Sequence, residues 1–305
     1  MSNKVEAIYI PTAAAADKRR ALSPIVAVIL VLKVIIIGYF GYLLLEAIQH
    51  NTVKFDTIFF LFIVAGFFAQ LIDGALGMAY GVSCTTLLLS LGIPPKLASA
   101  SVHTSEIFTT GVSGLSHIRF NNLDKKLFYK IVFTGVFGAS LGAYLLSDLL
   151  DEAAIKPFIS LYLVFLGGYL IFKAIRKRTD AKPRRKYAPV LALFGGLLDA
   201  LGGGGWGPIV TSNLLSQGHN PRKTIGTVNT AEFFVTYFAT IVFIFVLGVQ
   251  HLDIVLGLVI GGVFAAPIGA YVTSKINPKT LLILVGVLVV FTSLWSLIIF
   301  FGNSI

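Results

Sequence analysis

Four acidic residues stand in sequence that is otherwise almost free of charge, and they form two pairs with one spacing. Asp73 precedes Glu106 by the same number of residues as Asp199 precedes Glu232. An ionised carboxylate in an apolar setting is costly, so such a group is usually paired, protonated or functional. Carboxyl groups of this kind can carry protons, or they can accept hydrogen bonds from backbone N–H groups that lack a helical partner.

The two acidic pairs belong to two copies of one longer segment. The first copy reads DGALGMAYGVSCTTLLLSLGIPPKLASASVHTSE, and the second reads DALGGGGWGPIVTSNLLSQGHNPRKTIGTVNTAE. An offset of 126 residues aligns them without a gap. The matched positions include Gly77 with Gly203, Tyr80 with Trp206, Gly81 with Gly207, Thr85 with Thr211 and His103 with Asn229. The chain therefore contains an internal duplication with a polar core.

The composition places this core in a membrane. The 305 residues are 56% hydrophobic and only 12% charged, with a mean hydropathy of +0.87, whereas soluble domains carry about 25% charged residues. Several uncharged runs approach the roughly 20 apolar residues that a spanning helix needs. Strand alternation is absent from the pattern. The sequence predicts an all-α polytopic membrane protein.

The order of the hydrophobic runs predicts an extra N-terminal helix and two repeats. We expect a tail and helix within residues 1–50, a first repeat at 51–177, a basic linker at 178–187 and a second repeat at 188–305. Each repeat would hold a broken helical hairpin, either re-entrant or discontinuous, and three further spans. The predicted spans lie near residues 22–47, 96–118, 126–148, 156–177, 222–248, 253–275 and 279–301, with the broken pairs at 56–92 and 188–218.

Basic residues predict the orientation of these spans. Most of the 24 lysine and arginine residues lie in the N-terminal tail, the linker and the connections on the same side of the predicted spans. The positive-inside rule places these segments, and so the N-terminus, in the cytoplasm. The second repeat then enters the membrane with the opposite orientation to the first, which is the inverted-topology arrangement of secondary transporters.

The broken hairpins predict an anion site. Gly81 and Gly207 each precede a short helix, expected at residues 82–91 and 208–217, with Pro208 at a favoured first-turn position. A helix that starts within the membrane presents free N–H groups and the positive end of its dipole to an anion. Hydroxyl and amide side chains nearby add donors. The residues expected to bind the anion are Gly81, Val82, Ser83, Thr85, Thr86, His103, Gly207, Pro208, Thr211, Ser212, Asn213 and Asn229.

Several of these side chains have two interpretations. Asp73 and Asp199 either hold each hairpin together by accepting backbone hydrogen bonds or take part in coupling. Glu106 and Glu232 either carry protons or serve helix packing. The tyrosine and tryptophan at positions 80 and 206 either gate the cavity or pack within the bundle. His103 and Asn229 lie one turn from the glutamates and either face the same cavity or are packing residues.

Other classes of protein fit poorly. The run GGGGWG contains the spacing of a dinucleotide-binding loop, but no strand precedes it. No nucleophile with a supporting base is apparent, so an enzyme is not expected. The linker 178–187 lacks the interleaved aromatic residues of a nucleic-acid binder. The single cysteine, Cys84, makes a thiolate metal cluster implausible, and no metal or cofactor is expected.

The segments DGALGMAYG and DALGGGGWGP, each followed by a short hydroxyl-containing helix and a polar helix that carries Glu106 or Glu232, resemble the TauE/SafE sulfite-exporter family, also called TSUP transporters. The resemblance covers nearly the whole chain after the first helix. It implies a bacterial inner-membrane exporter of sulfite or small organosulfonates, driven by an ion gradient. The first copy has Met78 and Ala79 where the second has Gly204 and Gly205, which leaves open whether both halves contact the substrate equally.

The expected function is thus secondary active export of a small sulfur oxyanion, such as sulfite, thiosulfate or sulfoacetate, with proton coupling through Glu106 or Glu232. A passive anion channel is the alternative, because it would use the same helix dipoles without coupling. An intramembrane enzyme or a signalling scaffold would need groups that the sequence does not show. The expected partners are the anion and membrane lipid, without nucleic acid, and a homodimer is a further expectation.

Overall fold

Helices form all the regular structure in the part of the chain that can be described. The computed structural model describes residues 23–50, 56–176, 185–217, 219–249, 251–272 and 278–302. Within these ranges no residue is in a strand. The all-helical class expected from the hydropathy pattern is therefore confirmed. The N-terminal tail and most of the linker expected at 178–187 lie outside the described residues.

The helices follow the predicted order, with boundaries within a few residues of those expected. The long helices are α2 (Pro24–Gln49), α3 (Thr57–Leu76), α5 (Pro95–Arg119), α6 (Lys125–Tyr144), α7 (Glu152–Ile175), α8 (Ala188–Gly202), α10 (Pro221–Leu247), α11 (Leu252–Val272) and α12 (Pro278–Gly302). The shorter elements are α4 (Tyr80–Ser90), the π-helices η1 (Leu145–Leu149) and η3 (Trp206–Thr211), the 3-10 helix η2 (Arg185–Tyr187) and α9 (Ser212–Ser216).

Local signals in the sequence explain where several helices begin. The side chains of Ser23, Asp56, Asp124, Asp151 and Asn220 each accept a hydrogen bond from a backbone N–H in the first turn of the helix that follows. Such N-caps satisfy donors that have no partner within the helix. Prolines at the first positions of α2, α5 and α10 have no N–H to leave unpaired.

A left-handed glycine breaks the chain at the same point of each duplicated segment. Gly77 ends α3 with φ 65°, and Gly203 ends α8 with φ 64°. A residue with a side chain is strained in this conformation, so glycine suits both positions. The chain then turns back into α4 or into η3 and α9. Each half thus contains a helix, a short irregular link and a short returning helix, which we term the first hairpin (α3–α4) and the second hairpin (α8–η3–α9).

The returning helices differ from the prediction in where they begin. They were expected to start at Val82 and Pro208, but α4 begins at Tyr80 and η3 begins at Trp206. The second one is also a π-helix for its first part, and only Ser212–Ser216 is α-helical. The hydropathy pattern did not reveal these extra residues because an aromatic side chain at a helix start gives the same apolar signal as one in the preceding link.

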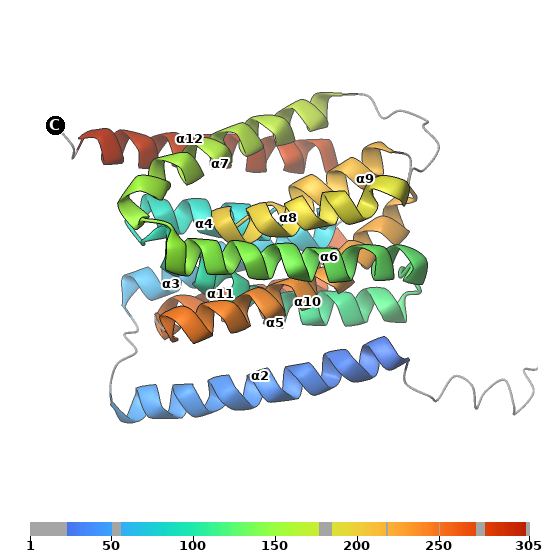
Figure 1. Cartoon of the computed structure of the whole chain (residues 1–305), viewed down its shortest axis with the longest axis horizontal. Helices are drawn as coiled ribbons and strands as arrows, with labels where there is room; N and C mark the ends of the chain where they lie inside the picture. Colours follow the sequence, from blue (N-terminus) through green and yellow to red (C-terminus); the bar gives the residue numbers. More distant parts are fainter. Residues whose placement is uncertain are drawn as a thin grey trace, which may run out of the picture.

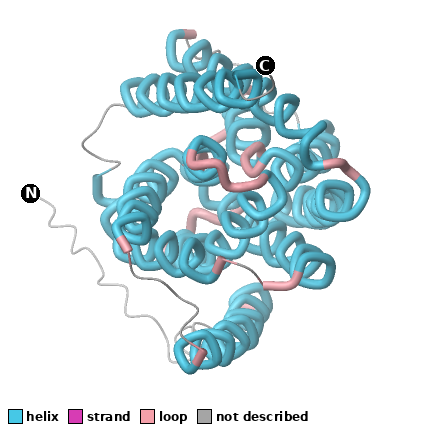
Figure 2. The backbone as a smooth tube through the Cα atoms, turned by 90° about the vertical axis from the view of Figure 1, so that its left-hand side faces the viewer, coloured by secondary structure: helices cyan, strands magenta, loops and turns pink. Residues whose placement is uncertain are grey.

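The helices pack as a bundle in which matching pairs occupy matching places. Helix α3 packs along α11, and its counterpart α8 packs along α6. Helices α5 and α10 pack against each other, and α7 packs against α12. Figure 1 shows α7 and α12 together along one side of the bundle, with α2 along the opposite side. Figure 2 shows the helices nearly end-on, with the irregular links inside the bundle.

Five helices within the described ranges are long and apolar enough to cross a membrane. These are Pro24–Gln49, Thr57–Gly74, Lys125–Leu149, Ala154–Ile175 and Arg222–Leu247. Helix α5 has 25 residues, which corresponds to about 37 Å at 1.5 Å per residue, yet its composition is too polar for this group. Many of its serine and threonine side chains are buried inside the bundle. These polar side chains therefore face other helices and not lipid, and they mark a candidate functional region.

Candidate functional site

The two hairpins contact each other directly through their glycines. A Cβ atom added to Gly81 would lie 2.9 Å from the Gly203 carbonyl oxygen, and one added to Gly207 would lie 3.0 Å from the Gly77 carbonyl oxygen and 2.6 Å from the Met78 Cα atom. Since Gly81 matches Gly207 and Gly203 matches Gly77, the two contacts are equivalent. The start of each short helix is thus covered by the irregular link of the opposite hairpin.

Two threonine hydroxyls tie the hairpins together. Thr85 Oγ1 donates to the carbonyl oxygen of Gly203 across 2.6 Å, and Thr211 Oγ1 donates to the carbonyl oxygen of Gly77 across 3.0 Å. Both hydroxyls are fully buried. These residues were predicted to bind an anion, but in this structure each hydroxyl proton is used in a bond between the hairpins.

Three other predicted donors bond within their own hairpin. The Thr86 hydroxyl donates to the Val82 carbonyl across 2.9 Å, the Ser212 hydroxyl donates to the Pro208 carbonyl, and the Asn213 amide donates to the Ile209 carbonyl across 2.6 Å. Ser83 differs from them. Its Oγ atom is buried and has no hydrogen-bond partner among the described residues. Ser83 therefore has a free donor beside the start of α4.

Asp199 caps the start of the second returning helix. Its Oδ1 atom accepts hydrogen bonds from the backbone N–H groups of Gly205, at 2.7 Å, and Trp206, at 3.0 Å. In the first hairpin, Asp73 accepts a hydrogen bond from the backbone of Tyr80, which matches Trp206. A carboxylate is well placed at a helix start, where unpaired N–H groups and the helix dipole favour negative charge.

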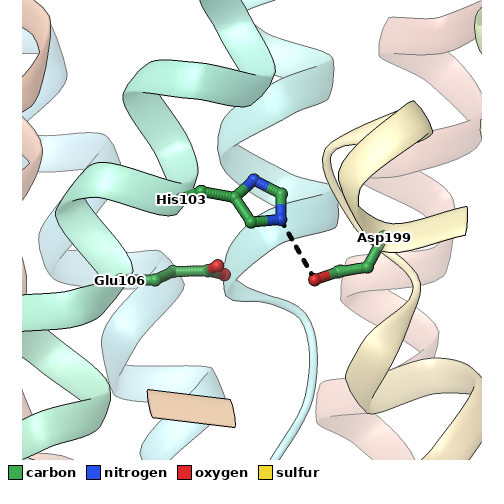
Figure 3. Close-up of side chains that lie close together, drawn as sticks. All are labelled: His103, Glu106 and Asp199. Carbon is green, nitrogen blue, oxygen red and sulfur yellow. Dashed lines mark hydrogen bonds and ion pairs between the residues drawn. The ribbon is translucent and has the colours of Figure 1, made fainter. Parts of the chain in front are cut away.

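His103 joins α5 to the second hairpin. Its Nε2 atom lies 3.2 Å from Asp199 Oδ2, and its Nδ1 atom lies 2.9 Å from the Ser99 carbonyl oxygen of its own helix. The Ser99 hydroxyl in turn donates to the Ala200 carbonyl across 2.7 Å. One ring nitrogen of His103, one carboxylate oxygen of Glu106 and one of Asp199 lie within 4.8 Å of one another. Figure 3 shows His103 and Glu106 side by side on α5, facing Asp199 on α8.

The four acidic side chains gather in one region. One oxygen of Glu106 lies within 4.8 Å of one of Asp199, and Glu232 is near enough to Asp73, Glu106 and Asp199 for their charges to repel one another. All four are at most 5% exposed. Because α3, α5, α8 and α10 each supply one carboxyl group, the acid cluster formed by these four residues joins both halves of the chain.

Several polar atoms near this cluster are buried without a hydrogen-bond partner among the described residues. They are Glu106 Oε2, Glu232 Oε2, Asp73 Oδ2, Asn229 Oδ1 and both polar atoms of the Gln70 side chain. Asn229 also donates from Nδ2 to Ser113 Oγ at 3.1 Å, and a Cβ on Gly77 would lie 3.2 Å from Asn229 Oδ1. Buried polar groups in proteins are nearly always paired, so a group of unpaired atoms is expected where a ligand or water binds.

The two aromatic residues predicted to gate or pack are both buried. Tyr80 is 2% exposed, and its hydroxyl group lies 3.0 Å from Ser105 Oγ and donates to the Leu258 carbonyl at 3.4 Å. Trp206 is 0% exposed, and its Nε1 donates to the Val228 carbonyl at 3.3 Å. In this conformation both side chains act in packing.

Sequence reasoning missed several contributors to the region. Tyr162 reaches from α7 and donates to the Gly204 carbonyl at 3.0 Å, and Lys173 Nζ donates to the Ser212 carbonyl at 2.9 Å. Gln70 and Ser99 were also missed. Of these, only Gln70 gave a signal in the sequence, as an uncharged polar residue within an apolar run one turn before Asp73. Tyr162, Lys173 and Ser99 lie far along the chain from the backbone atoms that they bind.

The fold and the buried polar core define a class, that of multi-pass helical membrane proteins with a polar interior. The family model described as "Sulfite exporter TauE/SafE" matches residues 61–296. The chain is also 45% identical over 247 residues to "Probable membrane transporter protein YtnM" of Bacillus subtilis (strain 168), which covers 78% of this chain and 82% of that protein. No solved structure matches the chain.

The chain therefore belongs to the TauE/SafE sulfite exporter family, and it is a membrane transporter, not an enzyme. The family match covers the second hairpin, the first hairpin from residue 61 onward, and all four acidic residues of the cluster. It begins after α2, the helix that was predicted to be additional to the repeats.

Proposed function

We propose that this protein is a secondary active transporter that exports sulfite or a related small sulfur oxyanion and couples this export to protons. The anion binds where the two hairpins meet, beside the starts of α4 and η3. The observation that carries the proposal is the gathering of four buried carboxyl groups and several unpaired polar atoms at this meeting point.

Electrostatic repulsion between an anion and the acid cluster supports proton coupling. Two unit charges 5 Å apart interact by about 3 kcal/mol at an effective dielectric constant of 20. An anion beside four ionised carboxylates would therefore be strongly repelled. Protonation of one or more of these groups removes the repulsion, so that the anion and the protons occupy the site together.

The hydrogen bonds indicate which acids carry the protons. The oxygens of Asp199 are used in holding the second hairpin, because they accept two backbone N–H groups and contact His103. Glu106 and Glu232 each have one carboxyl oxygen that is buried without a partner, a position in which a neutral acid costs less than an anion. Asp73 Oδ2 is unpaired as well, but Asp73 accepts a hydrogen bond from the Tyr80 backbone at the start of α4. The two glutamates are thus the proposed proton carriers, and the two aspartates hold the hairpins.

The proposed topology is a pair of inverted repeats with the N-terminus and the linker in the cytoplasm, in a bacterial inner membrane. Support comes from the distribution of basic residues in the sequence and from the matching contacts of Gly81 and Gly207 and of Thr85 and Thr211. With this topology the two hairpins approach the middle of the membrane from opposite sides, and the oxyanion lies between them.

The test is transport of sulfur-35-labelled sulfite by purified protein in liposomes, with and without a pH gradient. We expect saturable transport that responds to the gradient, and competition by unlabelled organosulfonates. Exchange of labelled for unlabelled anion identifies a transporter, whereas a channel shows no such counterflow. Gradient-independent flux without counterflow would contradict the proposal and favour the passive channel.

The role of the glutamates is tested by the double variant Glu106→Gln and Glu232→Gln. Glutamine keeps the size and hydrogen-bonding capacity of the side chain but cannot exchange a proton. We expect the response to the pH gradient to be lost, while counterflow of sulfite is retained. The matched control is Glu46→Gln, which changes an exposed glutamate near the end of α2. Retained coupling in the double variant would exclude these two residues as proton carriers.

A further inference from the structure

The central helices α5 and α10 run in opposite directions, and their two ends are closed differently. At the end where α10 begins, the link between α5 and α6 lies on the first turns of α10. Lys223 Nζ donates to the carbonyl oxygens of Asn121, at 2.5 Å, and Leu123, at 3.3 Å. The backbone N–H of Asp124 donates to Thr227 Oγ1 across 2.8 Å. We term these three bonds the latch.

A glycine allows the latch to close. A Cβ atom added to Gly226 would lie 2.6 Å from the Asn122 carbonyl oxygen and 2.8 Å from the Asn122 Cβ. Real Cβ atoms do not approach so closely, so a larger residue at this position would push the link away from α10. The side chain of Asn122 also lies 3.4 Å from His117 Nδ1 on α5.

At the other end of the same helix pair, the matching place is a pocket. It lies between the start of α5 and the end of α10, beside Gly248 and Val249 of the α10–α11 link, and has a cavity volume of about 20 Å³. Leu97, Ala100 and Ser101 line it from α5. By the offset of 126 residues, these three occupy the positions of Lys223, Gly226 and Thr227. Leucine has no donor in place of the lysine ammonium, and Ala100 has the Cβ atom that the latch excludes.

The pocket leads toward the acid cluster. Phe243 lines the pocket, and its ring centroid lies 5.8 Å from that of His103. His103 in turn contacts Asp199. The Phe243 side chain therefore contacts both the pocket and a residue of the polar interior. At the latched end, the residue that matches Phe243 is His117, which is bonded to the link that closes this end.

We propose that this pocket, lined in part by Leu97, Ala100 and Phe243, is the mouth through which the small oxyanion passes between the acid cluster and one face of the membrane, and that the latch is the closed mouth on the other face. This inference rests on the proposed function. The latched end carries the stronger closure because lysine, glycine and threonine stand where the pocket has leucine, alanine and serine. The closure at the pocket is therefore the weaker of the two, and on the proposed topology this face is the external one.

Thiol accessibility tests the inference without reference to any one substrate. Cys84 is the single cysteine, and it is buried, so it is first replaced by alanine. Ala100→Cys then places a thiol in the pocket. Its rate of reaction with a membrane-impermeant methanethiosulfonate that carries a sulfonate group is measured in intact cells. We expect rapid labelling from outside, and slower labelling when sulfoacetate, an organosulfonate that does not react with the reagent, competes.

Weakening the latch moves the equilibrium toward the state that is open at the other face. We expect Lys223→Gln to lower the labelling rate of Ala100→Cys at least threefold, and Gly226→Ala to act in the same direction. Lys126→Gln is the matched control, since Lys126 is an exposed lysine close to the same link, and it should leave the rate unchanged. All variants are compared as monodisperse, folded protein by gel filtration.

The inference is overturned if Ala100→Cys is unreactive from both faces, or if both latch variants leave its labelling rate unchanged. Labelling from the cytoplasmic face in inside-out vesicles alone would overturn the assigned orientation. If the latch variants alter labelling while liposomes transport no sulfite under any gradient, the assignment of the two mouths is supported and sulfite is excluded as the substrate.

Discussion

The hydroxyl group of Thr85 donates a hydrogen bond across 2.6 Å to the carbonyl oxygen of Gly203, which lies in the break of the opposite hairpin. Thr211 makes the corresponding bond to Gly77 at 3.0 Å. The last carbonyl groups of a helix have no partner within it, and both glycines end a helix. Each threonine therefore satisfies a carbonyl that the other hairpin leaves unpaired, and the two hairpins stabilise each other.

This relationship predicts that Thr85→Val and Thr211→Val each lower stability. Valine keeps the shape of the side chain but leaves a buried carbonyl without a donor, which costs about 1–3 kcal/mol. The measurement is the thermal unfolding midpoint in one detergent. Thr292→Val serves as the control, because the Thr292 hydroxyl is exposed and bonds within its own helix. Equal midpoints for all three variants would contradict the importance of the bonds between the hairpins.

The close approach of the hairpins predicts a strong effect of alanine at Gly81 or Gly207. The added methyl group would lie against backbone atoms of the opposite hairpin, at 2.9 Å for Gly81 and 2.6 Å for Gly207, and overpacking of this kind costs about 1–3 kcal/mol. Gly41→Ala is the control, since nothing lies within 4 Å of its added Cβ. Alanine there raises helix propensity by up to about 1 kcal/mol. A lower unfolding midpoint only for Gly81→Ala and Gly207→Ala is the expected result.

The cap formed by Asp199 predicts different effects of two substitutions. Asp199→Ala leaves the N–H groups of Gly205 and Trp206 without an acceptor and should cost about 1–3 kcal/mol of stability. Asp199→Asn retains a carbonyl oxygen, so its unfolding midpoint should fall less. Asp253→Asn, near the start of α11, controls for the loss of a charge. If the asparagine variant unfolds as early as the alanine variant, the charge of Asp199 and not its role as acceptor stabilises the hairpin.

The sequence predicted the class of fold because the signals for it are local. Apolar runs and prolines or capping residues at helix starts were enough to place most helices within a few residues of their observed bounds. The duplication was visible because matching residues such as Asp73 and Asp199 keep one offset. The first returning helix was placed two residues late, since the positive φ of Ala79 that precedes it leaves no mark in an apolar run.

The tertiary structure alone decided how the polar residues are used. Thr85 and Thr211 were chosen from the sequence as anion donors, but their hydroxyls bind carbonyl groups more than 100 residues away. The contact of His103 with Asp199 and the closure of one end by Lys223 likewise join distant segments. Hydropathy and helix signals depend on neighbours along the chain, and so the sequence determined a duplicated helical membrane protein with buried acids. The partner of a buried donor depends on which backbone lies within 3 Å of it, and only the packing of one hairpin against the other brings that backbone into place.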